Sequence, residues 1–275
     1  MKKRSWSQLL FFFALNPHLL NFVRGTVHSG ATKSFCVPVL NCYSCPAAAF
    51  SCPIGALQTV AGAANKVSHF VLGTLVFIGS AVGRAACGWV CPFGWLQDAL
   101  ARLKGSHIYI PRTYEKMRYF WLGFTLFAGM WLTDPQTGVS IPPFCKYICP
   151  QGTLQAGVPL TLSNYSLRSL IGPLFWFKVA VLMLILGASV LIKRGFCRFM
   201  CPLGAIMGLT NYFSWYQITV DNTKCVKCES CVDICPVEID IRNNPKDFQC
   251  VRCSDCAGIC PTGAIGNNLP WKKHS

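Results

Sequence analysis

The segment Cys87-Gly88-Trp89-Val90-Cys91-Pro92-Phe93-Gly94 is one copy of a motif, Cys-x3-Cys-Pro-x-Gly, that recurs along the chain. Complete copies also cover Cys145–Gly152 and Cys197–Gly204, and a looser copy covers Ser51–Gly55. Proline is favoured in the first turn of a helix, because its missing N–H has no intrahelical partner there. We therefore expect each copy to place a cysteine beside a helix N-terminus, where free N–H groups favour an anionic ligand.

The composition favours a membrane domain with a small appendage. Only 13% of the 275 residues are charged, and the mean hydropathy is +0.40. The 18 cysteines occur at spacings typical of metal ligation rather than of a disulfide scaffold. The net charge of +15 is spread between apolar segments, which favours a protein in contact with membrane lipid. We expect no nucleic-acid partner.

Four apolar segments are predicted to be transmembrane helices: Leu9–Val23, His69–Val82, Tyr119–Thr133 and Ile171–Ile192. Some are shorter than the roughly 20 residues that a spanning helix needs, so flanking residues or local thinning of the bilayer must help. A cleaved signal peptide is the alternative for the first segment, although Asn16-Pro17 interrupts it. Lys and Arg are more numerous in the segments that lie on the same side of the membrane as the N-terminus. We therefore expect a multi-pass protein of the prokaryotic inner membrane with both termini in the cytoplasm.

This topology divides the motif cysteines between two sites in a tandem repeat, each suited to one 4Fe-4S cluster. The inner site is expected to use Cys87, Cys91, Cys197 and Cys201. The outer site is expected to use Cys45, Cys52, Cys145 and Cys149, with Cys42 as an alternative ligand and Cys36 left over. For the inner site, packing cysteines or a thiol pair that exchanges disulfides or binds copper remain alternatives. For the outer site, the alternative is a set of disulfides.

The composition changes after Gln217, which predicts a membrane domain at residues 1–217 and an α+β domain at 218–275. The second domain contains two Cys-x2-Cys-x2-Cys-x3-Cys-Pro runs, the bacterial two-cluster ferredoxin pattern, in which the fourth cysteine of each run serves the other cluster. The first cluster should use Cys225, Cys228, Cys231 and Cys260. The second cluster should use Cys235, Cys250, Cys253 and Cys256. A zinc site is the alternative for these cysteines.

With CGWVCP at Cys87, CRFMCP at Cys197 and the terminal ferredoxin runs, the chain resembles the membrane-bound polyferredoxins. This family includes the quinol-dehydrogenase subunit of periplasmic nitrate reductase and the nitrous-oxide reductase maturation protein. The resemblance implies four membrane helices, a cytoplasmic ferredoxin domain and electron transfer linked to quinol. The outer cysteines, in NCYSCP at Asn41, SCP at Ser51 and CKYICP at Cys145, depart from the nitrate-reductase pattern.

From these patterns we expect an electron-transfer subunit with about four 4Fe-4S clusters and no catalytic residues of its own. It would connect a cytoplasmic redox protein with a redox partner on the outer face of the membrane. One alternative is a quinol- or quinone-linked dehydrogenase subunit of a respiratory complex. Another is an assembly factor that reduces a metal or senses redox state.

Overall fold

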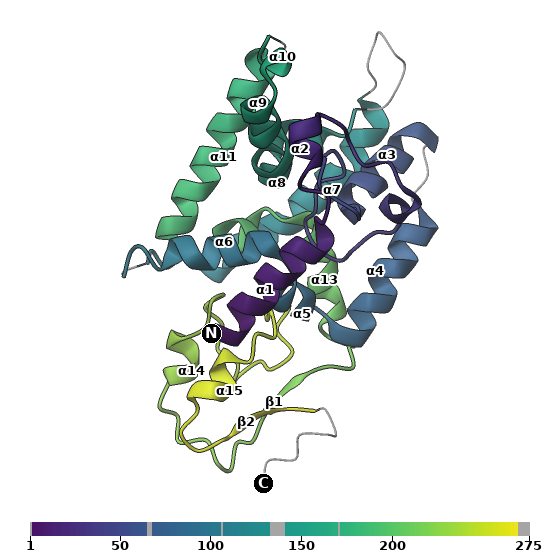
Figure 1. Cartoon of the computed structure of the whole chain (residues 1–275). Coiled ribbons are helices and arrows are strands. Elements are labelled where there is room, and N and C mark those ends of the chain that lie inside the picture. The colour runs from purple at the N-terminus through teal and green to yellow at the C-terminus, as the bar shows by residue number, and fades with distance from the viewer. Residues whose placement is uncertain (1, 65–67, 106, 133–140, 170, 269–275) are drawn as a thin grey trace.

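A computed structural model describes residues 2–64, 68–105, 107–132, 141–169 and 171–268. Most of these residues are helical, and the two described strands lie in the C-terminal domain. Figure 1 shows this domain at one end of the molecule, with the helices stacked above it and the N-terminus close to it.

Helices form at all four of the apolar segments: α1 (Lys2–Leu15), α4 (His69–Val82), α7 (Met117–Trp131) and α11 (Pro173–Leu191). Within the described residues, α11 is the one helix long and apolar enough to cross a membrane. Its 19 residues extend for about 28 Å, close to the roughly 30 Å of a hydrocarbon core. Thr133, at the end of the third predicted segment, lies outside the described residues.

The first apolar segment is not one continuous helix. α1 ends at Leu15, and a separate short helix, α2 (Asn21–Arg24), follows Asn16 and Pro17. Proline disfavours helical backbone in the residue before it, so Asn16 ends the helix. The side chain of Asn16 is buried and donates to the carbonyl of Phe12 at 2.9 Å. The predicted span Leu9–Val23 is therefore interrupted, and the helix begins earlier in the sequence.

The four long helices alternate in direction relative to the C-terminal domain. The N-terminal end of α1 contacts this domain through an ion pair between Arg4 and Asp255 at 2.6 Å. The N-terminal end of α7 contacts it through Arg118, which donates to Gln249 Oε1 at 2.6 Å. α4 and α11 contact the C-terminal domain through their C-terminal ends. The carbonyl of Val82, at the end of α4, accepts a hydrogen bond from Arg252. Lys193, just after α11, donates to the carbonyl of Asp233.

Each motif copy starts a helix at its proline, as the sequence predicts. These helices are α3 (Pro53–Ala64), α6 (Pro92–Ala101), α8 (Pro150–Gly152) and α13 (Pro202–Thr210). The third copy continues through η4 (Thr153–Gly157) into α9 (Val158–Ser163). The segments that carry the first cysteine of each complete copy are also helical: α5 (Ala85–Trp89), η3 (Phe144–Ile148) and α12 (Gly195–Phe199).

As far as residue 268, where its description ends, the C-terminal domain consists of two antiparallel strands and two short helices. Strands β1 (Ile218–Val220) and β2 (Ile265–Asn267) pair with Ile218 opposite Asn267. Helices α14 (Ser230–Asp233) and α15 (Asp255–Ile259) each lie within one cysteine run, so the domain has the predicted ferredoxin-like organisation. The remaining short helices are η1 (Ala31–Ser34), η2 (Arg112–Lys116) and α10 (Tyr165–Arg168).

Candidate iron-sulfur sites

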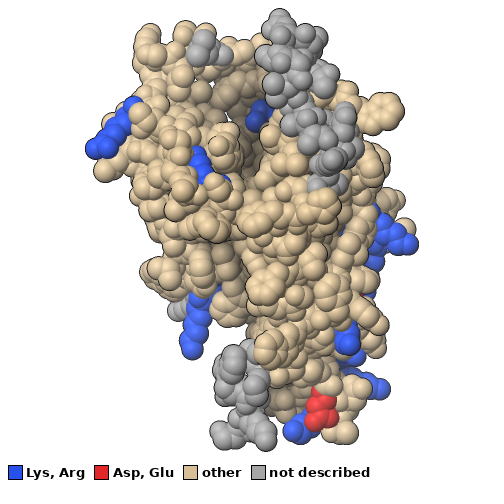
Figure 2. Space-filling view, turned by 90° about the vertical axis from the view of Figure 1, so that its right-hand side faces the viewer, with Lys and Arg blue, Asp and Glu red and all other residues tan. Residues whose placement is uncertain are grey.

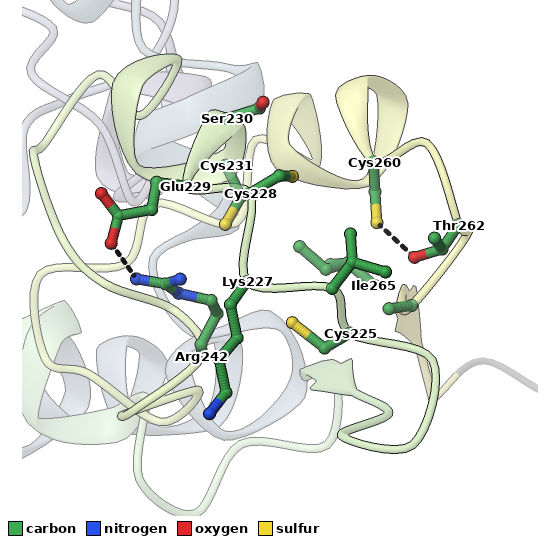
Figure 3. Close-up of a pocket in the computed structure, with 12 residues that line it drawn as sticks. Cys225, Lys227, Cys228, Glu229, Ser230, Cys231, Arg242, Cys260, Thr262 and Ile265 are labelled. Atoms are coloured by element: carbon green, nitrogen blue, oxygen red, sulfur yellow. Dashed lines mark hydrogen bonds and ion pairs between the residues drawn. The ribbon is translucent and has the colours of Figure 1, made fainter.

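In the C-terminal domain, Cys225, Cys228, Cys231 and Cys260 line one cavity. Figure 3 shows these side chains around a common space, with Cys260 contributed by the second run. The backbone and side chain of Ser230 form hydrogen bonds that lower the pKa of Cys228, which favours the thiolate form. The structure therefore brings together the four cysteines that the sequence assigns to the first cluster, at a site where Cys228 reaches the surface.

A second cavity in this domain is lined by Cys235, Cys250, Cys253 and Cys256, and Cys231 also lines it. The set contains the fourth cysteine of the first run together with three cysteines of the second. Burial, together with the nearby cysteines Cys250 and Cys235, raises the pKa of Cys256 to about 12. A metal removes this barrier, because a coordinating thiol is deprotonated outright.

The two cysteine runs adopt the same unusual backbone. Lys227 and Glu229 flank Cys228 with φ of 55° and 62°, and Arg252 and Ser254 flank Cys253 with φ of 49° and 61°. Left-handed backbone costs a non-glycine residue roughly 1–2 kcal/mol. It also directs successive backbone N–H groups into a concave surface that favours an anion. The second run therefore repeats the first in three dimensions as well as in sequence.

The cysteines of the inner quartet, Cys87, Cys91, Cys197 and Cys201, are all buried, with each residue at most 8% exposed. The charge of Cys201 interacts with those of the other three thiols, so the quartet is gathered in one place. Cys201 Sγ accepts a hydrogen bond from the backbone of Gly204 at 3.3 Å. This contact is the one expected of a thiolate beside a helix N-terminus.

Two fully buried arginines link the motif copies of the inner quartet, because each arginine precedes one copy and donates to a cysteine carbonyl of the other. Arg84 Nη2 donates to the carbonyl of Cys197 at 3.3 Å, and Arg194 Nη1 donates to the carbonyl of Cys87 at 3.4 Å. Arg194 is also paired with Asp98 at 2.7 Å. Within the described part of the chain, Arg84 has no carboxylate within ion-pair distance, and its Nε has no hydrogen-bond partner. A buried cation of this kind needs a counter-charge, and a cluster held by four thiolates carries about −2.

The outer motif cysteines line a larger cavity of about 700 Å³. The charge of Cys145 interacts with those of Cys149, Cys52 and Cys42, which places these four thiols together. Cys42 also lies near the third motif copy: its backbone N–H donates to Gln155 at 3.1 Å, and a Cβ on Gly152 would lie 3.6 Å from its sulfur. Cys42 is therefore well placed as the fourth member of this quartet.

Cys45, which the sequence placed in the outer quartet ahead of Cys42, does not line this cavity. It is fully buried in a small cluster with Ala47, Ala48 and Ala156. Cys36 does line the cavity, with its sulfur 3.5 Å from Ser51 Oγ. All 18 cysteines are free thiols in the structure, so the cysteines near this cavity form no disulfide there.

Lysines face the outer cavity. Lys33 is 5% exposed, and its ammonium donates to the carbonyls of Tyr43 at 2.7 Å and Cys45 at 3.3 Å. Lys178 on α11 donates to the carbonyl of Cys145 at 3.4 Å. Figure 2 shows a hollow at the end of the molecule away from the C-terminal domain, with basic side chains inside it. This environment suits an anionic group held by the cysteines.

The sites are connected to one another by close backbone contacts. Between the C-terminal domain and the inner quartet, a Cβ on Gly88 would lie 2.4 Å from the carbonyl oxygen of Val251, and Trp89 Nε1 donates to the carbonyl of Arg252 at 3.1 Å. Between the two quartets, the backbone of Leu40 lies beside the Cys91 thiol, and the backbone of the next residue, Asn41, lies beside the Cys52 thiol.

Among the described residues, no three His, Cys, Asp or Glu side chains converge closely enough to hold a single metal ion. In a four-iron cluster each cysteine binds a different iron, so the ligands of a cluster surround a space rather than a point. The cavities lined by the two C-terminal quartets have this arrangement.

Several residues at these sites were not predicted from the sequence, although their spacing carries a signal. Arg84 and Arg194 each lie three residues before the first cysteine of an inner copy. Gln58, Gln97 and Gln155 each lie six residues after the cysteine that precedes proline. In the structure, all five of these side chains are buried at the sites.

Comparisons with known proteins support iron-sulfur binding in both parts of the chain. Residues 214–272 match the family described as a 4Fe-4S dicluster domain. Residues 67–111, 139–160 and 174–217 match the family described as a 4Fe-4S binding domain. These three ranges contain the three complete motif copies. No solved structure matches the chain significantly.

Relatives are found in archaea and bacteria. The chain is 28% identical to an uncharacterised protein of Methanocaldococcus jannaschii over 70% of this chain and 76% of that protein. It is 29% identical to protein NirI of Paracoccus denitrificans over 58% of this chain and 23% of NirI. It is 26% identical to the methylamine utilization ferredoxin-type protein MauN of Methylorubrum extorquens over 66% of this chain and 59% of MauN. The chain therefore spans less than two thirds of NirI and of MauN.

Proposed function

Because the chain belongs to the polyferredoxin-type 4Fe-4S electron-transport proteins, we propose that it conducts electrons across the cytoplasmic membrane through about four clusters. The clusters supply the one-electron chemistry, and the protein fixes their positions and tunes their potentials. One partner would be a redox protein in the cytoplasm, and the other a redox protein or complex on the outer face.

The outward surfaces of the four long helices support a position in the membrane. Large apolar side chains are exposed on each of them, including Leu10 on α1, Phe77 on α4, Phe127 on α7 and Leu184 on α11. Only 17% of the apolar window of α11 is buried, whereas the core helix of a soluble protein would be mostly buried. In the face shown in Figure 2, acidic side chains appear only at the end that holds the C-terminal domain.

The first step of the proposed path joins the ferredoxin-like domain to the inner quartet. Cys87 belongs to the same buried cluster as Cys231 and Cys250, with Cys253 packed against it. Arg194, which donates to the Cys87 carbonyl, also interacts electrostatically with Cys197 and Cys253. The second ferredoxin site and the inner quartet are therefore packed against each other.

The contact made by Leu40 and Asn41 is the observation that carries the proposal furthest. These consecutive residues lie beside a cysteine of the inner quartet and a cysteine of the outer quartet, respectively. One residue spans at most about 3.6 Å of chain, so only a short stretch of backbone lies between the Cys91 and Cys52 thiols. This supports a short step between the quartets, instead of the two distant sites near opposite faces that the sequence led us to expect.

The orientation is proposed from the same contacts. The N-terminus and the ferredoxin-like domain lie at the same end of the molecule, joined by the Arg4–Asp255 ion pair (Figure 1). With the excess of Lys and Arg on this side, both termini would be cytoplasmic. α1, α4 and α7 would then cross the membrane with α11, although they are shorter than a full span, by thinning of the bilayer around them.

The outer cavity favours a second candidate function, a quinol- or quinone-linked dehydrogenase subunit. Its volume of about 700 Å³ is within the range of small-molecule sites, roughly 300–1,000 Å³. A quinone bound there would lie beside the outer quartet, and electrons would enter or leave through the membrane pool. An assembly factor that reduces a metal has no comparable observation in its favour.

Electron transfer in proteoliposomes tests the proposal. The reconstituted protein would be reduced by a low-potential donor outside vesicles that enclose a high-potential, membrane-impermeant acceptor. We expect the enclosed acceptor to be reduced by the wild-type protein in quinone-free lipid, and Cys145→Ser with Cys149→Ser to stop this while the ferredoxin clusters stay reducible. Transfer that requires added quinone would favour the second candidate, and transfer unaffected by the double variant would contradict the proposal.

A further inference from the structure

Gln97 on α6 joins the two motif copies of the inner quartet. Its side-chain Nε2 donates to Cys197 Sγ at 3.0 Å, and its Oε1 accepts from the backbone N–H of Phe196 at 3.1 Å. The side chain is fully buried. A single amide therefore contacts both the ligand sulfur and the residue before it.

Gln58 on α3 repeats this arrangement at the outer quartet. Its Nε2 donates to Cys145 Sγ at 3.2 Å, and its Oε1 accepts from the backbone N–H of Phe144 at 3.0 Å. Gln58 is also fully buried. Both glutamines lie six residues after the cysteine that precedes proline, and each reaches the first cysteine of the other copy in its quartet.

The other two copies do not make this bond. Gln155, at the same position of the third copy, donates to Asn16 at 2.6 Å and Asn41 at 2.8 Å. The fourth copy has Met207 there, which is fully buried and has no amide. The structure thus gives each quartet one glutamine that bonds to sulfur.

Resting on the cluster-based function proposed above, we propose that Gln58 and Gln97 are positioning residues that raise the reduction potentials of the outer and inner clusters. Reduction adds negative charge to a cluster and its sulfur ligands, so a hydrogen bond to sulfur stabilises the reduced state more than the oxidised state. Burial strengthens the effect, because no water competes for the sulfur.

The test uses Gln97→Met and Gln58→Met, which install the residue that the fourth copy has at this position. The matched control is Gln8→Met, since Gln8 is also buried but donates to the carbonyl of Cys91 at 3.2 Å and not to a sulfur. Iron content and an EPR-monitored redox titration are measured for each protein. In parallel, pulsed EPR of wild-type protein labelled with 15N in the glutamine side chains reports the amide nitrogen directly.

We expect Gln97→Met to lower the potential of the inner cluster alone, and Gln58→Met that of the outer cluster alone. At a fixed potential, the ratio of reduced to oxidised cluster should fall about tenfold, which is about 59 mV for one electron. Gln8→Met should leave the potentials unchanged. In the wild type, 15N coupling should appear at both quartets, which keeps the inference testable if a variant loses its cluster.

Full iron content with unchanged potentials, or absence of 15N coupling in the wild type, would overturn the role of the glutamines while leaving the proposed function intact. A protein with iron only in the ferredoxin-like domain would overturn both, because no cluster would then lie beside either glutamine.

Discussion

Gly88 and Val251 are in such close contact that a Cβ on Gly88 would lie 2.4 Å from the Val251 carbonyl oxygen. Gly88 lies between the inner cysteines Cys87 and Cys91, and Val251 lies between Cys250 and Cys253 of the ferredoxin-like domain. The contact therefore sets the distance between two cysteine sites that are about 160 residues apart in the sequence.

Gly88→Ala should separate the ferredoxin-like domain from the inner quartet. The added methyl group must displace backbone, so we expect a loss of about 1–3 kcal/mol in stability and slower electron exchange between the two sites. Rapid-freeze EPR after reduction of the ferredoxin clusters would measure that exchange. Gly187→Ala on α11 is the control, because a Cβ there meets nothing within 4 Å. Equal exchange rates in the two variants would refute the role of this contact.

Cys42→Ser and Cys45→Ser should differ in iron content. Cys42 lines the outer cavity beside Cys52, Cys145 and Cys149, whereas Cys45 is buried among alanines. We expect Cys42→Ser to lose about four iron atoms per chain and Cys45→Ser to keep them. Metal analysis of anaerobically purified protein decides this. Loss of iron in the Cys45 variant alone would restore the ligand set first expected from the sequence.

Asp98→Asn should strongly destabilise the junction between α1, α6 and α12. Asp98 pairs with Arg4 and Arg194, each at 2.7 Å, and all three side chains are buried. Arg4 keeps its pair with Asp255, but Arg194 loses its carboxylate partner, and leaving a buried charge unpaired in this way costs about 3–5 kcal/mol. Asp240→Asn is the control, since Asp240 pairs with Arg242 near the surface, where an ion pair contributes about 1 kcal/mol or less.

The destabilisation by Asp98→Asn should also depend on pH. Burial alone would raise the pKa of Asp98, but Arg194 and Arg4 more than offset this and hold the pKa below its usual value. A carboxyl with a lowered folded-state pKa stabilises the protein above its unfolded pKa and loses that contribution as pH falls through the folded value. The difference in thermal midpoint between wild type and variant should be constant near neutral pH and shrink below about pH 4. A difference that persists in acid would contradict this ion-pair account.

The sequence predicts much of this organisation because the chemistry is local. A proline after each motif cysteine specifies where a helix begins, and α3, α6, α8 and α13 begin there. The apolar segment predicted at His69–Val82 likewise coincides with α4. The ferredoxin runs repeat at fixed spacing, and the family comparison confirms the 4Fe-4S dicluster domain.

The features that could not be predicted from the sequence depend on contacts between residues that are distant in the chain. Cys42 and Cys45 lie in one loop, and only the packing of the third copy, through Gln155 and Gly152, distinguishes them. The proximity of the two quartets depends on the path of the loop at Leu40 and Asn41, which has no periodic pattern. Gln97 and Gln155 likewise lie at the same position of their motif copies, so only the structure shows that Gln97 donates to a cysteine sulfur and Gln155 does not.

The most direct test of the central claim is the iron content of anaerobically purified protein, combined with Mössbauer or EPR quantification of its clusters. Four clusters in one chain predict about sixteen iron atoms, with two clusters lost when the inner and outer quartets are both changed to serine. A value of about eight in the wild type, unchanged in that variant, would mean that only the ferredoxin-like domain holds clusters. That result would contradict a path through the membrane domain.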